Sequence, residues 1–185
     1  MSNLEKEIRL KITNNDIKKI KKITEIYKKK VRLIDITCGK YSFDSLNKLG
    51  YIGRIRCNND DYTIEIKNYQ NENECLEKSL SINSIKDGLD FFELLDMKPY
   101  LILDRYREVR KYNNLLLFID EFDTIGSYIE IEYQNSSKEE AIKFIDLLNL
   151  NKIQQKKYGD IVKQMISDDD SFGDKMNEIL QKYSK

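Results

Sequence analysis

Charged side chains two residues apart recur along this sequence. The pairs are Glu5/Glu7, Arg9/Lys11, Arg54/Arg56, Glu65/Lys67, Arg105/Arg107 and Glu130/Glu132. Residues two apart on a β-strand share a face, so each pair would project from one side of its strand. Arginine and lysine bind phosphate oxygens, whereas carboxylates bind divalent cations. The residue types therefore favour the binding of an anion together with a metal ion.

The sequence contains no histidine, and this narrows the chemistry further. Ser-His-Asp and Cys-His catalysis, histidine zinc sites and a histidine general base are all excluded. Any reaction would depend on carboxylates, lysine, arginine, tyrosine or a bound metal. A metal held by carboxylates alone would be a hard cation such as Mg²⁺ or Mn²⁺.

Length and composition predict one domain over residues 1–185, with a helical extension at 166–185. Lysine plus arginine and aspartate plus glutamate both number 32, so the net charge is zero and we expect no nucleic-acid partner. No apolar run is long enough to span a membrane, and no signal peptide is evident, so no membrane partner is expected. Three widely spaced cysteines indicate a reduced, cytoplasmic protein.

Hydrophobic periodicity predicts an α+β protein in which strands precede helices at the C-terminus. The expected strands are 4–12, 31–37, 51–57, 62–68, 100–112, 115–121 and 127–133, and the expected helices are 16–30, 84–97, 136–148, 157–166 and 171–183. Asn14, Asn15 and Asp16 are expected to cap the first helix, and residues 68–77 to form a loop. The run Asp168–Asp170 is typical of a helix start more than of a metal site.

In the first strand, Glu5, Glu7, Arg9 and Lys11 share one face and Leu4, Ile8, Leu10 and Ile12 share the other. Such a charged face could simply be solvated, since exposed ion pairs contribute only about 0–1 kcal/mol each. Because the opposite faces are also apolar, we favour a closed antiparallel β-barrel with a charged lumen and flanking helices. A lumen of both signs would suit a polyanion and its metal.

Several of these strands resemble motifs of the CYTH superfamily, the triphosphate tunnel metalloenzymes. Glu5-x-Glu7-x-Arg9 is similar to its Glu-x-Glu-x-Lys signature, Gly53–Arg56 to Leu-Arg-Ile-Arg, Thr63–Lys67 to Leu-Thr-x-Lys, Arg105–Arg107 to Lys-x-Arg, and Phe118–Glu132 to Leu-Asp-Glu…Gly…Phe-x-Glu-Ile-Glu. Lys157–Val162 resembles the Ser-Tyr-x-x-Leu-Leu of class IV adenylyl cyclases. The resemblance spans about residues 4–162 and is greatest to that cyclase branch.

The resemblance implies a triphosphate tunnel that binds ATP or tripolyphosphate with Mg²⁺ or Mn²⁺. It assigns the phosphates to Arg9, Lys11, Arg54, Arg56, Lys67, Arg105 and Arg107, and the metal to Glu5, Glu7, Asp120, Glu130 and Glu132. Lys11 and Arg107 are the predicted catalytic residues. A homodimer is one assembly that such a chain could form.

Arg9 replaces the signature lysine, and an arginine stays protonated and cannot act as a general base, so Lys11 would supply that role or the role is lost. Two reactions fit the resemblance. In a cyclase the ribose 3′-hydroxyl of ATP attacks the α-phosphorus and pyrophosphate leaves, whereas in a triphosphatase water attacks the terminal phosphorus. A non-catalytic polyphosphate- or nucleotide-binding module and a purely structural charged sheet are the remaining alternatives.

Overall fold

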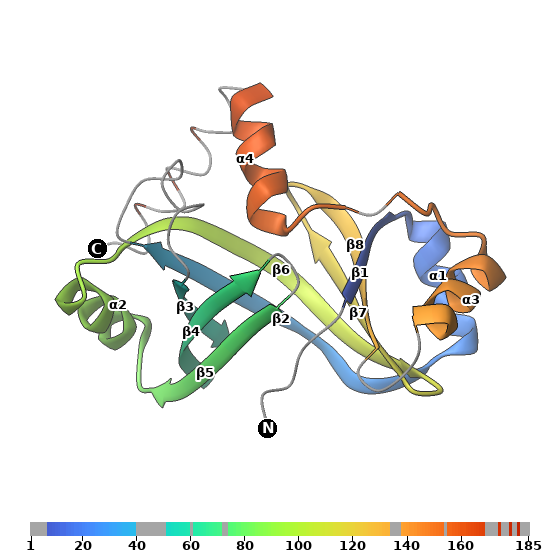
Figure 1. Ribbon diagram of the computed structural model, residues 1–185, viewed down its shortest axis with the longest axis horizontal. Helices are drawn as coiled ribbons and strands as arrows, with labels where there is room; N and C mark the ends of the chain where they lie inside the picture. The colour runs from blue at the N-terminus through green and yellow to red at the C-terminus, as the bar shows by residue number, and fades with distance from the viewer. Residues whose placement is uncertain are drawn as a thin grey trace. The chain divides into compact units, whose positions relative to one another are not determined.

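The computed structural model describes residues 7–39, 51–59, 61–71, 74–133, 138–153 and 155–168, with the single positions 174, 178 and 181. The strands of this part are β1 (Glu7–Ile12), β2 (Glu25–Gly39), β3 (Tyr51–Asn58), β4 (Asp61–Asn71), β5 (Glu74–Ile82), β6 (Lys98–Tyr112), β7 (Leu115–Phe122) and β8 (Gly126–Glu132). Its helices are α1 (Asn14–Ile23), α2 (Ile85–Leu94), α3 (Lys138–Leu148) and α4 (Tyr158–Asp168) (Figure 1). The predicted α+β class is confirmed.

The described strands form one eight-stranded antiparallel sheet in the order β1-β8-β7-β6-β2-β3-β4-β5. Within the described residues, no hydrogen-bonded pairing joins the end strands β1 and β5. The antiparallel sheet is therefore confirmed, whereas its closure into a barrel stays a prediction.

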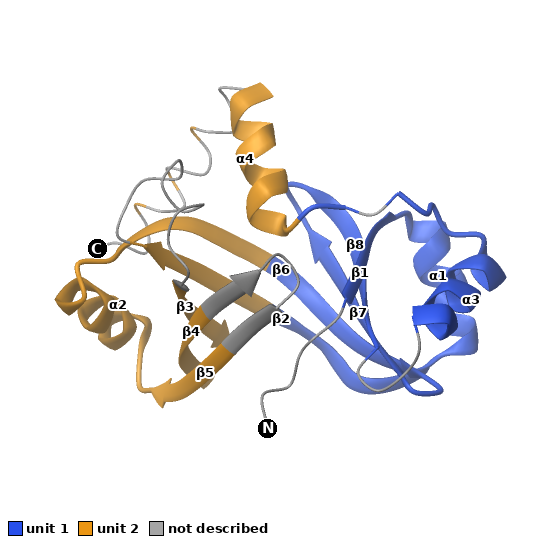
Figure 2. Cartoon of the chain, viewed as in Figure 1, with its two compact units in different colours: residues 1–32, 105–156 blue, residues 33–104, 157–185 orange. Residues whose placement is uncertain are grey.

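The chain divides into two compact units, each assembled from two segments (Figure 2). Unit 1 comprises Met1–Arg32 and Arg105–Lys156, and unit 2 comprises Leu33–Asp104 and Lys157–Lys185. Two of the three boundaries fall inside β2 and β6, so these two long strands contribute residues to both units, and the third lies just before α4.

In unit 1, the apolar face of the β1, β7 and β8 strands packs on α1 and α3. Its core consists of Ile8, Leu10, Ile12, Ile17, Ile20, Leu115, Leu117, Ile119, Ile129, Ile131, Ala141, Phe144, Ile145, Leu148 and Leu150. Every second strand residue belongs to this core, as the alternation in the sequence predicts. The intervening residues must therefore project from the other face.

In unit 2, one face of β2, β3 and β4 packs on α2. The core contains Ile36, Cys38, Ile55, Ile64, Phe92, Met97 and Ile102. A Cβ atom at Gly53 would lie less than 3.0 Å from the Phe92 ring, so this glycine permits the helix to approach β3 closely. That contact fixes which face of β3 is buried, and its arginines project from the opposite face.

Two predicted boundaries are wrong. The first helix ends at Ile23 instead of continuing to residue 30, because Thr24 is extended and β2 begins at Glu25. Its N-cap is Thr13, whose hydroxyl accepts a hydrogen bond from the backbone N–H of Asp16 in a capping box. The predicted loop at 68–77 is instead largely strand, since β4 runs to Asn71 and β5 begins at Glu74.

The other predicted elements agree with the structure to within a few residues. Asn59 and Asn113 have positive φ angles of 55° and 51° at the tips of the β3–β4 and β6–β7 hairpins, where asparagine tolerates the left-handed conformation. Most of the last predicted helix lies outside the described residues. Among the described residues, no helix has the length and apolarity required to cross a membrane.

Candidate functional site

Strand register aligns the charged residues of unit 1 in transverse rows on one face of the sheet. Arg9 on β1 lies opposite Glu130 on β8. One row further along, Tyr128 on β8 lies opposite Asp120 on β7, which in turn lies opposite Arg107 on β6. Residues directly opposite each other in an antiparallel pair share a face, so these side chains all project away from the helices.

Arg9 contacts two carboxylates and a backbone carbonyl. Its Nε and Nη2 atoms lie 2.9 and 2.5 Å from Glu130 Oε1, and Nη2 also lies 2.6 Å from Glu7 Oε1. Its Nη1 donates to the Lys156 carbonyl oxygen at 2.9 Å. Only 7% of Arg9 is exposed, so its charge is neutralised within the protein by neighbouring carboxylates.

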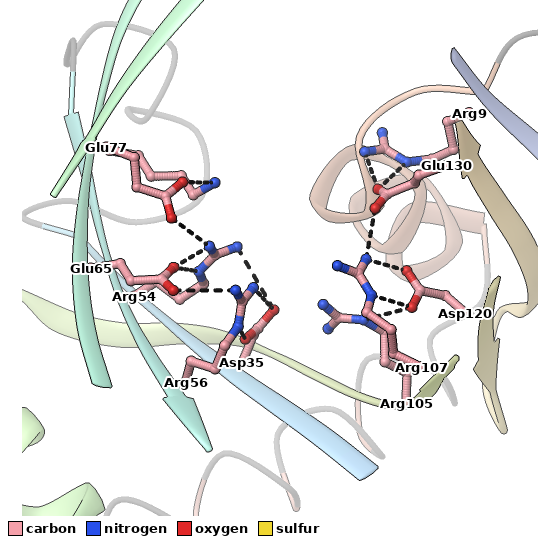
Figure 3. Close-up of polar contacts among 11 residues, drawn as sticks. Arg9, Asp35, Arg54, Arg56, Glu65, Glu77, Arg105, Arg107, Asp120 and Glu130 are labelled. Atoms are coloured by element: carbon pink, nitrogen blue, oxygen red, sulfur yellow. Dashed lines mark hydrogen bonds and ion pairs between the residues drawn. The ribbon is translucent and has the colours of Figure 1, made fainter. Parts of the chain in front are cut away.

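Arg107 forms a two-pronged ion pair with Asp120. Nε donates to Oδ1 at 2.6 Å and Nη2 to Oδ2 at 2.5 Å, and Nη2 also lies 2.6 Å from Glu130 Oε2 (Figure 3). Arg105 Nε lies 3.3 Å from Asp120 Oδ1. Three arginines thus surround two carboxylates in unit 1.

Glu130 lies at the centre of this unit 1 network. Burial on its own would raise the pKa of Glu130, but the guanidinium groups of Arg107 and Arg9 outweigh burial and lower the pKa to about 2. Glu130 is therefore ionised throughout the neutral pH range. Its charge keeps both arginines in place.

Unit 2 contains a second network on β2, β3 and β4. Asp35 on β2 lies opposite Arg56 on β3, and Arg54 lies opposite Glu65 on β4. Arg56 Nε donates to Asp35 Oδ1 at 2.8 Å and Nη2 to Oδ2 at 3.0 Å, while Nη1 donates to Glu65 Oε1 at 3.2 Å. Glu65 also forms a close ion pair with Arg54. Asp35 is only 1% exposed and lies at the buried end of the network.

The network continues to the sheet edge through Glu77 on β5. Glu77 Oε1 lies 3.5 Å from Arg54 Nη2, and Oε2 lies 2.5 Å from Lys67 Nζ (Figure 3). Burial alone would raise the pKa of Glu77, but the hydrogen bond from Lys67 and the nearby positive charges lower it. Positive and negative groups therefore alternate from Asp35 to Lys67.

Both units use the same order of contacts, Asp–Arg–Glu–Arg. In unit 1 the order is Asp120, Arg107, Glu130 and Arg9, and in unit 2 it is Asp35, Arg56, Glu65 and Arg54. In each unit the aspartate is buried and its arginine partner is more exposed, with 15% of the Arg107 side chain and 24% of the Arg56 side chain accessible. Each arginine is thus oriented by a carboxylate that solvent does not reach.

The predicted phosphate-binding residues occur on both units. Unit 1 carries Arg9, Lys11, Arg105 and Arg107, and unit 2 carries Arg54, Arg56 and Lys67. All except Lys11 belong to the two networks. Lys11 is exposed on the same strand face as Arg9, with its Nζ atom 6.0 Å from the centroid of the Tyr128 ring.

The predicted metal ligands do not all have the same surroundings. Glu5 lies outside the described residues. Glu7 and Glu132 lie directly opposite each other on β1 and β8, and Glu7 is also ion-paired with Arg9. Asp120 and Glu130 are ion-paired with arginines as well. No group of three or more potential metal-ligating side chains was found in the described part of the chain. Facing carboxylates repel each other and are the donor type that Mg²⁺ and Mn²⁺ prefer, so Glu7 and Glu132 fit such a cation.

Asp35 was absent from the predicted site, and Glu65 and Glu77 were not assigned a role. Asp35 is the one acidic residue in the apolar run Leu33–Ile36, a pattern that could have singled it out. Glu77 lies in the stretch 68–77, for which the sequence predicts a loop. The pairing of these carboxylates with arginines depends on strand register, which the local sequence pattern does not give.

The CYTH domain family model matches residues 3–166. A conserved hypothetical protein of Pyrococcus furiosus has a similar structure, with a TM-score of 0.70 and 20% identity over 85% of this chain and 99% of that one. A proposed adenylate cyclase of Vibrio parahaemolyticus gives a TM-score of 0.66 and 13% identity over 88% and 99% of the two chains.

A third similar structure is a proposed adenylyl cyclase of Hippeastrum in which triphosphatase activity is dominant. Its TM-score is 0.59, with 15% identity over 86% of this chain and 95% of that one. At these identities the likeness is one of fold. Among curated protein sequences no significant match was found. Because the family match extends over most of its length, the chain belongs to the CYTH family.

Proposed function

We propose that this chain is a metal-dependent enzyme that acts on a triphosphate and converts ATP to cyclic AMP and pyrophosphate, as class IV adenylyl cyclases do. The observation that carries the proposal is the pair of Asp–Arg–Glu–Arg networks, in which arginines are held in fixed orientations on strand faces. Planar guanidinium groups match the geometry of phosphate oxygens. Catalysis of phosphoryl and nucleotidyl transfer depends largely on such positioning and charge neutralisation.

The basic and the acidic residues would have different roles in binding the substrate. The basic residues would bind phosphate oxygens: Arg9, Lys11, Arg54, Arg56, Lys67, Arg105 and Arg107. Glu5, Glu7 and Glu132 would hold Mg²⁺ or Mn²⁺, and Asp120 and Glu130, which orient arginines, would complete the acidic set. A bound cation of this type would neutralise part of the phosphate charge. The closed barrel implied by the resemblance remains part of this proposal.

Arg107 and Lys11 would have the catalytic roles. Arg107 would stabilise the negative charge that develops on the phosphate oxygens during transfer, because Asp120 fixes the plane of its guanidinium group. Arg9 remains protonated and cannot accept a proton from the attacking hydroxyl. The exposed Lys11 on the same strand face is the alternative that we assign to that step.

Hydrolysis of the terminal phosphate is the second candidate reaction. The observation that favours it is the similar fold of the Hippeastrum protein, whose dominant activity is that of a triphosphatase. A tripolyphosphate or nucleoside triphosphate would then bind through its phosphates alone, and orthophosphate would be released.

A product assay tests the proposal. The purified chain is incubated with ATP or with tripolyphosphate, each with Mg²⁺ and with Mn²⁺, and the products are separated by ion-exchange chromatography. Cyclic AMP and pyrophosphate are expected from ATP. Orthophosphate released fastest from tripolyphosphate would establish the hydrolase instead, and binding without any product would establish a binding module.

Variants of the assigned residues provide the matched test. Arg107→Ala and Glu7→Gln are expected to abolish turnover while the far-ultraviolet circular dichroism spectrum stays native. Asp90→Asn, which removes an exposed ion pair with Lys86 on α2, is expected to retain full activity. Wild-type turnover in both site variants would refute the assignment of these residues.

A further inference from the structure

We propose that Asp35 is a positioning residue, which holds the Arg56 guanidinium group in the orientation that binds a phosphate. The inference rests on the proposed function and extends it to β2, a strand that carries none of the residues assigned above. Asp35 would not touch the substrate. It would act through Arg56.

Burial shows that Asp35 requires its arginine partner. It is 1% exposed and lies between Leu33 and Ile36, which are 5% and 1% exposed. An ionised carboxylate at such a place is unfavourable unless it is paired and hydrogen-bonded. Arg56 provides both, because two of its nitrogens donate to the two Asp35 oxygens at 2.8 and 3.0 Å.

These contacts fix the plane of the Arg56 guanidinium group. A two-pronged contact prevents rotation about the last bonds of the arginine side chain, and the contact from Nη1 to Glu65 Oε1 at 3.2 Å holds the third nitrogen. An asparagine at position 35 would present one oxygen and one N–H₂ group. It would lack the negative charge, and it could no longer accept one arginine nitrogen on each of its two terminal atoms.

Relative exposure shows which side of the ion pair faces solvent. The Asp35 side chain is 1% exposed and the Arg56 side chain is 24% exposed, so the cation can be reached by an anion and its counter-ion cannot. Unit 1 repeats this arrangement, with Asp120 0% exposed and Arg107 15% exposed. The same arrangement in a second set of strands supports a functional role for the buried aspartate, which is to orient its arginine partner.

Binding measurements in a double-mutant cycle test the inference. Isothermal titration with tripolyphosphate in the presence of EDTA gives the Kd of wild type, Asp35→Asn, Arg56→Ala and the double variant. We expect about tenfold weaker binding in each single variant. Because Asp35 acts through Arg56, the double variant should bind no more weakly than Arg56→Ala alone. Asp90→Asn serves as the control and should bind like the wild type.

A second readout follows the arginine directly. In ¹H–¹⁵N spectra the Nε–H group of Arg56, assigned by its loss in Arg56→Lys, should be protected from exchange in wild type and exchange rapidly in Asp35→Asn. If Asp35→Asn does not fold, Asp35→Glu keeps the charge but displaces the carboxylate by one methylene. The Asp35→Glu variant should fold and bind tripolyphosphate more weakly than wild type. Its Arg56 Nε–H group should exchange rapidly with solvent.

The outcomes separate this inference from the proposed function. If wild type binds tripolyphosphate neither in EDTA nor with Mn²⁺ while the Arg56 signal still depends on Asp35, the proposed function fails and only the orienting contact remains. If wild type binds and a folded Asp35 variant has the same Kd, the inference is overturned. It is equally overturned if the losses from Asp35→Asn and Arg56→Ala add, or if the Nε–H protection survives in Asp35→Asn.

Discussion

Glu130 accepts contacts from arginines on two other strands. Arg9 reaches Oε1 from β1 and Arg107 reaches Oε2 from β6, so the carboxylate joins strands that are far apart in the sequence. Removing one partner from such a buried cluster leaves the remaining charges unpaired, which typically costs about 3–5 kcal/mol. Glu130 therefore has a structural role whatever ligand the protein binds.

The lowered pKa of Glu130 leads to a prediction about acid stability. The folded-state pKa of about 2 lies below the usual value of 4.5, so ionised Glu130 stabilises the fold above pH 4.5. That contribution should be lost as the pH falls from 4.5 through 2, and it amounts to about 3 kcal/mol. Urea denaturation of the wild type at pH 7, 4.5, 3 and 2 measures this loss.

Glu130→Gln provides the comparison. The variant should be less stable than wild type by about 3 kcal/mol at pH 7, and its stability should decline less below pH 4.5. Asp146→Asn removes the exposed ion pair with Lys152 and should keep the wild-type pH profile. Identical pH profiles for wild type and Glu130→Gln would show that Glu130 does not titrate as described.

At the scale of elements, alternation of apolar and charged residues predicted most strands and the faces from which their charges project. The prediction failed where a tertiary contact determines the structure. Arg110 on β6 donates to the Lys21 and Thr24 carbonyl oxygens at 3.2 and 2.6 Å, at the point where α1 ends. The lysine-rich sequence beyond this point is compatible with a helix, so the local pattern could not show that β2 begins there.

The candidate site was predictable to a similar extent. The shared faces of Arg54 and Arg56, or of Arg105 and Arg107, follow from their spacing alone. Their partners do not, because Asp35 and Asp120 are placed by the register of other strands. The local sequence therefore predicts from which strand face a charged side chain projects. Its ion-pair partner can be identified only once the pairing of the strands is known.

Strand β5, at the end of the sheet order, carries a carboxylate whose removal should strengthen phosphate binding, whereas loss of the Asp35 carboxylate should weaken it. Its Glu77 carboxylate contacts both Arg54 and Lys67, two of the proposed phosphate-binding residues. A phosphate that binds these cations must compete with this carboxylate, whose lowered pKa keeps it charged. Glu77→Gln should therefore bind tripolyphosphate about three- to tenfold more tightly than wild type.

Glu93→Gln controls for the change in net charge. It removes one negative charge from the exposed surface of α2, in the same unit, and should leave the Kd unchanged. Isothermal titration calorimetry at a single ionic strength measures the Kd of tripolyphosphate for wild type, Glu77→Gln and Glu93→Gln. Equal tightening in both variants would show that general electrostatic attraction, and not release of Arg54 and Lys67, is responsible.

At the scale of the whole molecule, positive and negative residues are equal in number, and one sheet face in each unit carries a network of ion pairs. The opposite faces are apolar and bury α1, α2 and α3. Each network contains nearly as many carboxylates as cations, which keeps the fold stable when no anion is bound. A ligand should therefore add to a structure that is already formed.

This reasoning predicts that polyphosphates raise the melting temperature according to their length. A ligand present at 100 times its Kd stabilises a protein by about 2.7 kcal/mol, which for a chain of this size corresponds to a Tm increase of about 5–10 °C. Tripolyphosphate with Mn²⁺ should therefore raise the Tm most, pyrophosphate less and orthophosphate least, because fewer oxygens reach the oriented arginines.

Differential scanning fluorimetry at matched ionic strength measures these shifts. Arg107→Ala should lose most of the increase caused by tripolyphosphate, while Asp90→Asn should keep it, since Asp90 pairs with Lys86 on the exposed surface of α2. Equal shifts for the three phosphates would indicate a general salt effect. A full shift in Arg107→Ala would mean that the ligand binds away from the Asp120–Arg107 pair, and the assignment of unit 1 to phosphate binding would then be wrong.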